Sequence, residues 1–305
     1  MPDPYSRKIT VDEKDKLMAV AARLMQSDYT PPSCIAKSAD FANDMLIEET
    51  PIALIYNQIS YAVMMATPAD LLDFAVGIST SEAIAGTPVD ANAIRLVQRA
   101  NGIECHMALD NDDMHRLRRR LRSTQSSSAC GLCGVKGLAQ AVRVPETLAM
   151  IPCLCSTESI VQIMDQLRVH QPLHDRTHAA HAAAFVDLET GGIIIREDIG
   201  RHNALDKLGG ALLRKGINRS NGVLALTSRL SVDMVQKAAA LEIPVIVTPS
   251  APSTLAVRLA EVARITLIGR VRNNNFTLYT HPTRMLGQTH RPLPEMVEVS
   301  PSEHR

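Results

Sequence analysis

Aromatic side chains are scarce in this 305-residue chain: tryptophan is absent, and aromatic residues make up only 3% of the sequence. The core must therefore be built from aliphatic side chains, and a hydrophobic share of 46% is typical of globular proteins. No stretch approaches the ~18 apolar residues of a membrane span, and the first residues lack the apolar run of a signal peptide. We therefore expect a cytoplasmic protein that does not act at a membrane.

An excess of one charge is also missing, because lysine plus arginine and aspartate plus glutamate each number 32. A chain without net charge has no global field that would favour nucleic acid as a partner, so any anion site must be local. Six cysteines are too few for a disulfide scaffold in a chain of this length. In a reducing compartment, cysteines that are close in sequence favour metal binding or chemistry.

The most regular pattern lies in the second half of the chain, where short apolar runs alternate with segments of helical periodicity. The expected strands are 222–226, 243–247 and 265–268, and the expected helices are 202–215, 231–241 and 253–263. This alternation predicts an α/β fold in which parallel strands are covered on both faces by helices.

Further elements are predicted upstream and divide the chain. We expect strands at 52–56, 60–65 and 103–109, a helix after Pro68, a basic helix at 112–122, a helix from an N-cap at Thr157 to about His170, and a hairpin of 182–188 with 193–197. The predicted organisation is an N-terminal extension (1–44), a smaller α+β subdomain ending in a cysteine loop (45–150), an α/β ligand-binding subdomain (151–285) and a loosely ordered tail (286–305).

Three strand ends carry hydroxyl and guanidinium groups, and ligands of open parallel sheets bind outside the carboxyl ends of the strands. These ends are Thr227-Ser228-Arg229, Thr248-Pro249-Ser250 and Gly269-Arg270-Val271-Arg272. Arginine binds phosphate oxygens in bidentate fashion, and helix N-termini attract anions. The pattern predicts a site for a phosphate-bearing ligand, although ordinary turn chemistry with surface arginines would produce the same residues.

A dense polar segment, Arg196-Glu197-Asp198-Ile199-Gly200-Arg201-His202-Asn203-Ala204, lies where a predicted strand meets a predicted helix. Such density is typical of a functional site. A helix N-cap with local salt bridges is the structural alternative, and the sequence does not decide between the two.

The cysteine pair Cys130-Gly131-Leu132-Cys133-Gly134 allows three chemistries. A zinc site could combine it with Cys153-Leu154-Cys155, but one residue between the second pair is fewer than zinc sites usually have. Thioredoxin-like exchange is disfavoured because the pair follows a serine-rich linker instead of a strand. In a sulfur relay, a thiolate carries sulfur as a reversible persulfide. Upstream cations would favour the thiolate, and they are Arg116, Arg118, Arg119, Arg120 and Arg122. The alternative for this run is an ordinary solvated helix face, which is the usual role of such runs.

Six motifs in order resemble the FdhD family, the accessory sulfurtransferases of formate dehydrogenase. The motifs are Pro51-Ile52-Ala53-Leu54-Ile55-Tyr56-Asn57, Val63-Met64-Met65-Ala66-Thr67-Pro68, Cys130-Gly131-Leu132-Cys133-Gly134, Glu197-Asp198-Ile199-Gly200-Arg201-His202-Asn203-Ala204-Leu205-Asp206-Lys207, Ser228-Arg229-Leu230-Ser231 and Tyr279-Thr280-His281-Pro282. The similarity runs from about Glu48 to Thr283, which is most of the chain.

The resemblance implies a homodimer with a cytidine-deaminase-like core. It also implies that Cys130 receives sulfur from a cysteine desulfurase as a persulfide and that Cys133 is an accessory thiol. The implied acceptor is the molybdenum bis(molybdopterin guanine dinucleotide) cofactor, before its insertion into formate dehydrogenase. Its guanine-nucleotide end is expected at Arg270, Val271, Arg272, Asn273, Asn274 and Asn275, and the strand-end reasoning adds Ser228 and Arg229.

Two departures from the family pattern are visible. The chain reads Thr177-His178-Ala179-Ala180-His181-Ala182 where the family usually has Thr-Gly-Gly before a His-Ala pair, and the 270–275 loop lacks the glycine often found there. Deaminase chemistry is disfavoured, because the sequence has no His-x-Glu motif and Pro152-Cys153-Leu154-Cys155 is one residue short of Pro-Cys-x-x-Cys. The alternative function is a non-enzymatic chaperone that binds the cofactor and holds structural zinc, whereas the sulfurtransferase needs no metal of its own.

Overall fold

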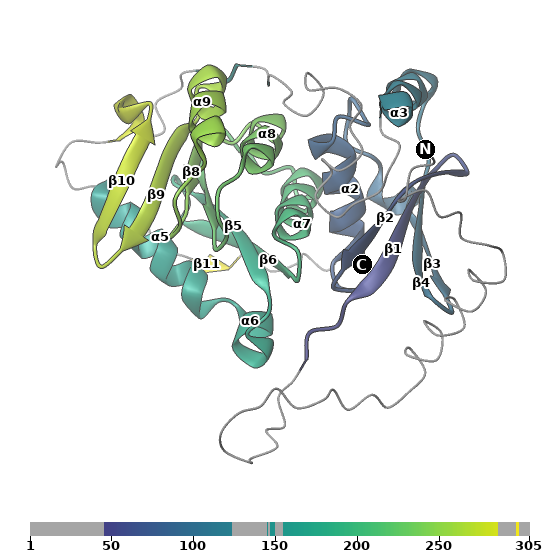
Figure 1. The fold of residues 1–305 in the computed structure, drawn as a ribbon, viewed down its shortest axis with the longest axis horizontal. Helices are drawn as coiled ribbons and strands as arrows, with labels where there is room; N and C mark the ends of the chain where they lie inside the picture. Colours follow the sequence, from purple (N-terminus) through teal and green to yellow (C-terminus); the bar gives the residue numbers. More distant parts are fainter. Residues whose placement is uncertain (1–45, 124–144, 146, 150–154, 286–296, 299–305) are drawn as a thin grey trace, which may run out of the picture.

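The computed structural model describes residues 46–123, 145, 147–149, 155–285 and 297–298. Two sheets lie on either side of a pair of helices, with the four-stranded sheet formed by the earlier part of the chain (Figure 1). Both sheets mix parallel and antiparallel strands, so the fold is mixed α/β. Among the described residues, no helix combines the length and the apolar character needed to cross a bilayer.

The N-terminal sheet has the strand order β2-β1-β4-β3. Its strands are β1 (Thr50–Tyr56), β2 (Ile59–Ala66), β3 (Arg95–Arg99) and β4 (Gly102–Met107). The strands expected at 52–56, 60–65 and 103–109 are confirmed, whereas β3 was not predicted because its mostly polar residues are exposed at the sheet edge. Asn57 and Gln58 close the β1–β2 hairpin with φ of 44° and 69°, as a type I′ turn requires.

Two helices cover this sheet and its flank, together with the short 3-10 turn η1 (Ala91–Ala93). The helix after Pro68 is α2 (Leu71–Ser81), and the basic helix is α3 (Asn111–Ser123), so both predictions are confirmed. Ile52 and Leu54 of β1 and Phe74 of α2 are fully buried in one cluster. This cluster gives the smaller unit a core of its own.

The C-terminal sheet has seven strands in the order β10-β9-β8-β7-β5-β6-β11. They are β5 (His181–Asp187), β6 (Gly192–Asp198), β7 (Gly222–Leu226), β8 (Val245–Val247), β9 (Thr266–Arg272), β10 (Asn275–Thr280) and β11 (Val297–Glu298). The parallel arrangement expected for β7, β8 and β9 is confirmed. The sheet is nevertheless mixed, because β5 is antiparallel to both neighbours and β10 is antiparallel to β9.

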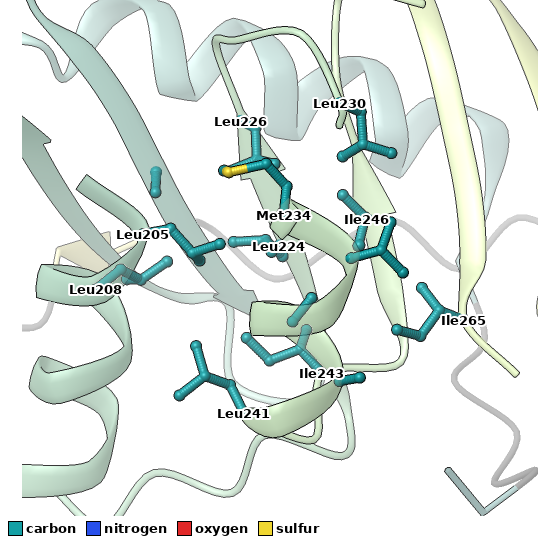
Figure 2. Packing of buried hydrophobic residues seen from close by; sticks show 14 of the residues in the cluster. Leu205, Leu208, Leu224, Leu226, Leu230, Met234, Leu241, Ile243, Ile246 and Ile265 are labelled. Atoms are coloured by element: carbon teal, nitrogen blue, oxygen red, sulfur yellow. The ribbon is translucent and has the colours of Figure 1, made fainter. Parts of the chain in front are cut away.

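Helices cover both faces of the parallel strands, as predicted. On one face lie α7 (Arg201–Arg214), α8 (Val232–Ala240) and α9 (Thr254–Ala263), and on the other lies α5 (Thr157–Val169). Side chains alternate accordingly along β7: Leu224 and Leu226 join the cluster with α7 and α8, whereas Val223 and Ala225 face α5. Figure 2 shows the first cluster, in which Leu224 packs between Leu205 of α7 and Ile246 of β8. A strand buried on both faces explains the continuous apolar run.

Several predicted boundaries were wrong. The N-cap of α5 is Ser156, whose hydroxyl accepts a hydrogen bond from the Ser159 amide, and not Thr157. Pro172 was expected only to stop α5, but it also begins α6 (Pro172–Thr177), where its missing amide hydrogen costs nothing. The strand expected at 265–268 continues to Arg272 and turns into β10. In the tail, Val297 and Glu298 pair with the edge strand β6. The periodicity of the sequence did not predict this pairing.

The two sheets are joined through a close crossing of α2 and α7 (Figure 1). A Cβ atom added to Gly77 of α2 would lie 1.7 Å from the Asp206 carbonyl oxygen, and one added to Gly210 of α7 would lie 1.8 Å from the Asp73 carbonyl oxygen. Only glycine allows the helix backbones to approach this closely. The two sheets therefore share a tightly packed contact, and the domain boundary expected near residue 150 stays a prediction.

Candidate functional site

The cysteine pair predicted to carry sulfur, Cys130 and Cys133, lies outside the described residues, as does Cys153. The chain that returns from this segment is tied to the C-terminal unit: the Leu148 amide donates to the Ala263 carbonyl (3.1 Å), and Arg284 donates to the Ala149 carbonyl (3.1 Å). Arg284 is 1% exposed and follows the Tyr279-Thr280-His281-Pro282 motif. Arg284, two residues beyond this motif, therefore helps to anchor Ala149.

The two cysteines that the structure does describe are poor nucleophiles. Cys105 of β4 is fully buried, and burial raises the pKa of its thiol to about 12. A thiol with that pKa carries almost no thiolate at neutral pH. Cys155 is also fully buried, in the core under α5. Neither residue competes with Cys130 as a candidate sulfur carrier.

The three predicted strand ends come together at one edge of the larger sheet. The Thr248 hydroxyl donates to the Ser228 carbonyl (2.6 Å), which links the ends of β7 and β8. The Val271 amide donates to the Thr248 carbonyl (3.3 Å), and the Arg270 amide donates to the Ser250 carbonyl (3.0 Å), which link β8 to β9. The carboxyl ends of β7, β8 and β9 therefore form a continuous, hydrogen-bonded rim.

The β9–β10 hairpin has the backbone of a tight turn with an adjacent irregularity. Asn273 and Asn274 have φ of 50° and 61°, the left-handed conformation that asparagine tolerates, so the absence of glycine in this loop is accommodated. Arg270 also has a positive φ of 59°, next to a register shift between the two strands. Bulges of this kind frequently redirect side chains beside active sites. The guanidinium groups of Arg270 and Arg272 are exposed here.

A cavity of about 610 Å³ opens at this same rim. Its walls come from the end of α5, from α6, from the start of β5 and from the ends of β7, β8 and β9. The lining residues are Met164, Leu167, Arg168, Gln171, His174, His178, Ala179, Ala180, His181, Thr227, Pro249 and Arg272. The volume lies in the range of small-molecule sites, roughly 300–1,000 Å³.

The polar groups of the cavity are cationic or neutral donors. Its lining includes two arginines, three histidines and no carboxylate. His174 and His178 meet edge to face, with ring centroids 5.8 Å apart, and the Nδ1 atom of His174 hydrogen-bonds the Ala180 carbonyl (3.0 Å). Burial, together with the positive charge of Arg201, lowers the pKa of His181 and so favours its neutral form. The arrangement favours an anionic ligand held mainly by arginine.

The structure places only some of the predicted binding residues at the cavity. Arg272 lines the cavity, whereas Val271 is buried in the core and the Ser228 hydroxyl is directed to the Arg229 carbonyl (3.1 Å). The other predicted residues lie on the exposed rim outside the lining, and they are Arg229, Arg270, Asn273, Asn274 and Asn275. Their binding roles stay predictions.

Sequence reasoning missed the histidines and Arg168 of the lining. The only available signal was the substitution of His178 and Ala179 where the family usually has glycines.

The sequence pattern that defines the FdhD/NarQ family matches residues 47–286, well over half of the chain. The chain belongs to the FdhD/NarQ family. Its relatives include the sulfur carrier protein FdhD of Bordetella petrii, 43% identical over 80% of this chain and 87% of that protein. The sulfur carrier protein FdhD of Cupriavidus necator is 44% identical over 79% of this chain and 84% of that protein.

A solved structure supports the fold of this FdhD/NarQ member. It is a putative formate dehydrogenase accessory protein from Desulfotalea psychrophila, with a TM-score of 0.57 over 80% of this chain and 91% of that one. At 23% identity this likeness concerns the fold alone.

The dense polar segment 196–204 of this FdhD/NarQ chain joins the two units. Asp198 accepts hydrogen bonds from the Thr67 amide (3.0 Å), the Gly200 amide (2.8 Å) and the Asn203 side chain (2.9 Å). It also pairs with Lys207 at 2.7 Å, and both side chains are 0% exposed. Glu197 accepts from the Leu173 and His174 amides and so fixes the start of α6 below the cavity. The structural interpretation of this segment is therefore favoured for Glu197 and Asp198.

A second buried ion pair lies at the same contact between the two units, which we call the seam. Lys237 of α8 lies 2.8 Å from Asp206 of α7 and 2.9 Å from Glu82 beyond the end of α2. Ser81 donates a hydrogen bond to Asp206 (2.5 Å). Burial raises the pKa of Asp206, and the Lys237 ammonium opposes that effect. Arg196 forms an ion pair with Asp73 at 2.7 Å in the same contact. The seam therefore contains several paired charges.

The remaining members of the segment lie between the seam and the cavity. His202 contacts Asp233 through its Nε2 atom. Burial lowers the pKa of His202, and the nearby charges of Arg201 and Lys237 lower it further. The Asp233 carboxylate acts in the opposite direction and raises it. The Nε atom of Arg201 and the hydroxyl of Ser231 are buried without a hydrogen-bond partner among the described residues. Among those residues, no three histidine, cysteine or acidic side chains are grouped so as to hold a metal ion.

Proposed function

We propose that this protein is a sulfur carrier that serves formate dehydrogenase in the cytoplasm. It accepts sulfur from a cysteine desulfurase as a persulfide on Cys130 and delivers it to the molybdenum bis(molybdopterin guanine dinucleotide) cofactor before insertion. Support comes from relatives named sulfur carrier protein FdhD and from a structural neighbour titled a formate dehydrogenase accessory protein. The observation that carries the delivery step is the arginine-bearing cavity at the rim of β7, β8 and β9.

The first step is an exchange between thiols without net oxidation. The Cys130 thiolate attacks the outer sulfur of the desulfurase persulfide, the sulfur–sulfur bond of the donor breaks, and the donor cysteine leaves as a thiolate. Cys130 then carries the outer sulfur as a persulfide, a reversible cysteine state. The cations upstream and the glycines at positions 131 and 134 favour a thiolate that a partner can approach.

The second step requires two electrons, because persulfide sulfur must become sulfide before it replaces an oxygen ligand on molybdenum. In our proposal Cys133 supplies them: its thiolate attacks the inner sulfur of the Cys130 persulfide, a Cys130–Cys133 disulfide forms, and hydrosulfide leaves. Two intervening residues are a spacing at which such disulfides form in redox motifs. A cellular dithiol then reduces the disulfide for the next cycle.

The cofactor is the acceptor substrate, and we propose that its guanine-nucleotide end occupies the cavity. A volume of about 610 Å³ suits one nucleotide, with Arg272 and Arg168 at the phosphates, so the pterin and molybdenum would extend beyond the cavity. The rim residues Arg229 and Arg270 stay candidates for contacts outside it. We further propose the homodimer and the cytidine-deaminase-like core that the resemblance implies.

Mass spectrometry tests the carrier assignment. Incubation with a cysteine desulfurase and cysteine should add one sulfur mass to the wild-type protein and to Cys133→Ala, but none to Cys130→Ala. In Cys133→Ala the persulfide should form yet persist when the cofactor is added, because the two electrons are missing. Addition of sulfur to Cys130→Ala but not to Cys133→Ala would contradict the assignment.

The alternative is a non-enzymatic chaperone that binds the cofactor and holds zinc on its cysteines. Elemental analysis of the purified protein separates the two functions. One equivalent of zinc that is lost in both Cys130→Ala and Cys133→Ala would occupy the thiolates that the relay needs and would favour the chaperone.

A further inference from the structure

Helix α3 is fixed firmly to the N-terminal unit by its inner face. Met114 and Leu117 are buried in the core of the smaller sheet. Asp113 accepts a hydrogen bond from the Gly86 amide (2.9 Å), and Arg120 donates to the Tyr61 hydroxyl (2.8 Å). Arg120 also pairs with Glu82, which is bound to Lys237 of the seam. The helix is therefore a rigid platform.

The outer face of α3 carries cations, most of which take no part in this anchoring. His115, Arg116, Arg118 and Arg119 are exposed. Arg116 lies 3.4 Å from Asp113, but Arg118 and Arg119 form no ion pair with any residue in the described ranges. A hollow lined by Asp112, His115, Arg116 and Arg119 opens on this face. These four exposed residues, His115, Arg116, Arg118 and Arg119, are termed the α3 basic face.

Apart from the Arg116–Asp113 pair, the α3 basic face contributes little to the fold. Arg116 and Arg119, and His115 and Arg119, are three and four residues apart on one helix. Like charges at those spacings cost about 0.2–0.5 kcal/mol per pair when both are ionised. A chain with 32 basic and 32 acidic residues has enough acids to neutralise them, yet the exposed arginines stay clustered. Such a face matches a partner of opposite charge.

The position of the helix in the chain limits where that partner acts. Cys130 follows Ser123, the last residue of α3, by seven positions (130 − 123). Seven residues span at most about 25 Å even when fully extended. A protein bound to the α3 basic face therefore has its own surface within reach of the Cys130 thiol. A sulfur donor needs this proximity, because persulfide exchange requires direct contact between the two sulfur atoms.

We infer that the α3 basic face is the docking site for an acidic surface of the sulfur donor, the cysteine desulfurase. The inference rests on the proposed function and assigns the donor to this face. A protein surface is favoured over nucleic acid because α3 carries no aromatic side chain for base stacking and the chain has no net positive charge.

Labelled sulfur transfer at increasing desulfurase concentration tests the inference. In Arg118→Glu/Arg119→Glu the apparent KM for the desulfurase should rise at least tenfold while kcat stays within about twofold, because surface charges act chiefly on association. Transfer from glutathione persulfide, a small donor that needs no docking, should be unchanged. The wild-type KM should increase with ionic strength, and the charge-preserving Arg118→Lys/Arg119→Lys should stay within about threefold of wild type.

The matched control is Arg258→Glu, which reverses an exposed charge on α9 of the other unit and should leave KM unchanged. An unchanged KM in the double glutamate variant overturns the docking site. An equal loss with glutathione persulfide also overturns it, because the arginines would then act on the Cys130 thiolate itself. Competition by duplex DNA would assign the face to nucleic acid. Wild-type protein that takes up sulfur from neither donor refutes the proposed function instead.

Discussion

The seam between the two units and the cavity at the strand ends are both rich in charge, but they use it differently. In the seam, Asp198 and Lys207 are fully buried and each is satisfied by the other and by backbone groups. At the cavity, Arg272 is exposed and pairs with no acidic residue in the described part of the chain. Buried paired charges hold the structure, whereas Arg272 is available to a ligand; Arg168 of the same lining pairs with the exposed Asp165 at 3.3 Å.

The comparison also shows why charge density in sequence is a weak guide to function. The segment Arg196–Ala204 is a dense polar motif, yet Glu197 and Asp198 link neighbouring elements of the fold. The cavity draws its donors from α5, α6, β5 and β9, which are far apart in sequence. The following three predictions separate the two regions, beginning with the largest effect.

The protein should be destabilised when one buried charge of the seam loses its partner. Asp198→Asn leaves the Lys207 ammonium buried without a counter-charge, so the free energy of unfolding should fall by about 3–5 kcal/mol. Urea denaturation measures it. In Asp198→Asn/Lys207→Met the unpaired charge is gone, so part of the loss should be recovered. A double variant less stable than Asp198→Asn would show that the pair is not the source of the effect.

The helix crossing beside the seam should be sensitive to a single methyl group. Gly210→Ala places a Cβ 1.8 Å from the Asp73 carbonyl oxygen, which belongs to a helix backbone that cannot move alone. We expect a loss of about 1–3 kcal/mol in the free energy of unfolding, the usual cost of overpacking.

The adjacent Gly209→Ala is the matched control for this crossing. The three atoms nearest to its Cβ would be Leu241 side-chain carbons, the closest at 2.8 Å, and these can rotate away. The alanine also gains about 1 kcal/mol of helix propensity. Thermal denaturation of the two variants should therefore differ clearly, and equal melting temperatures would contradict the close backbone contact.

The cavity should show the opposite behaviour, with binding lost and stability kept. Arg272→Gln should change the free energy of unfolding by less than about 0.5 kcal/mol, because the side chain is exposed. Its affinity for GDP, which stands for the nucleotide end of the cofactor, should fall about tenfold by calorimetry at fixed salt. Arg229→Gln, on the rim outside the lining, should have a smaller effect. An equal effect would extend the site along the rim.

Much of the fold followed from local patterns. Continuous apolar runs predicted β7 and β8, because strands buried on both faces need no polar alternation. The helices α7, α8 and α9 were predicted from periodicity and from their capping residues. The strands β3 and β10 and the pairing of β11 were missed. The residues of β3 are mostly exposed, and β10 and β11 are ordered by pairing with β9 and β6 instead of by an apolar pattern of their own.

The sequence by itself determined the family, the cysteine pair and the strand ends, because each depends on residue types at fixed spacing along the chain. Only the tertiary structure decided which two arginines line a cavity and that histidines 174, 178 and 181 share it. It alone showed that Asp198 is a buried link to Thr67, 131 positions away in the chain. Burial and charge pairing depend on neighbours from distant segments, and these distances exist only once the chain has folded.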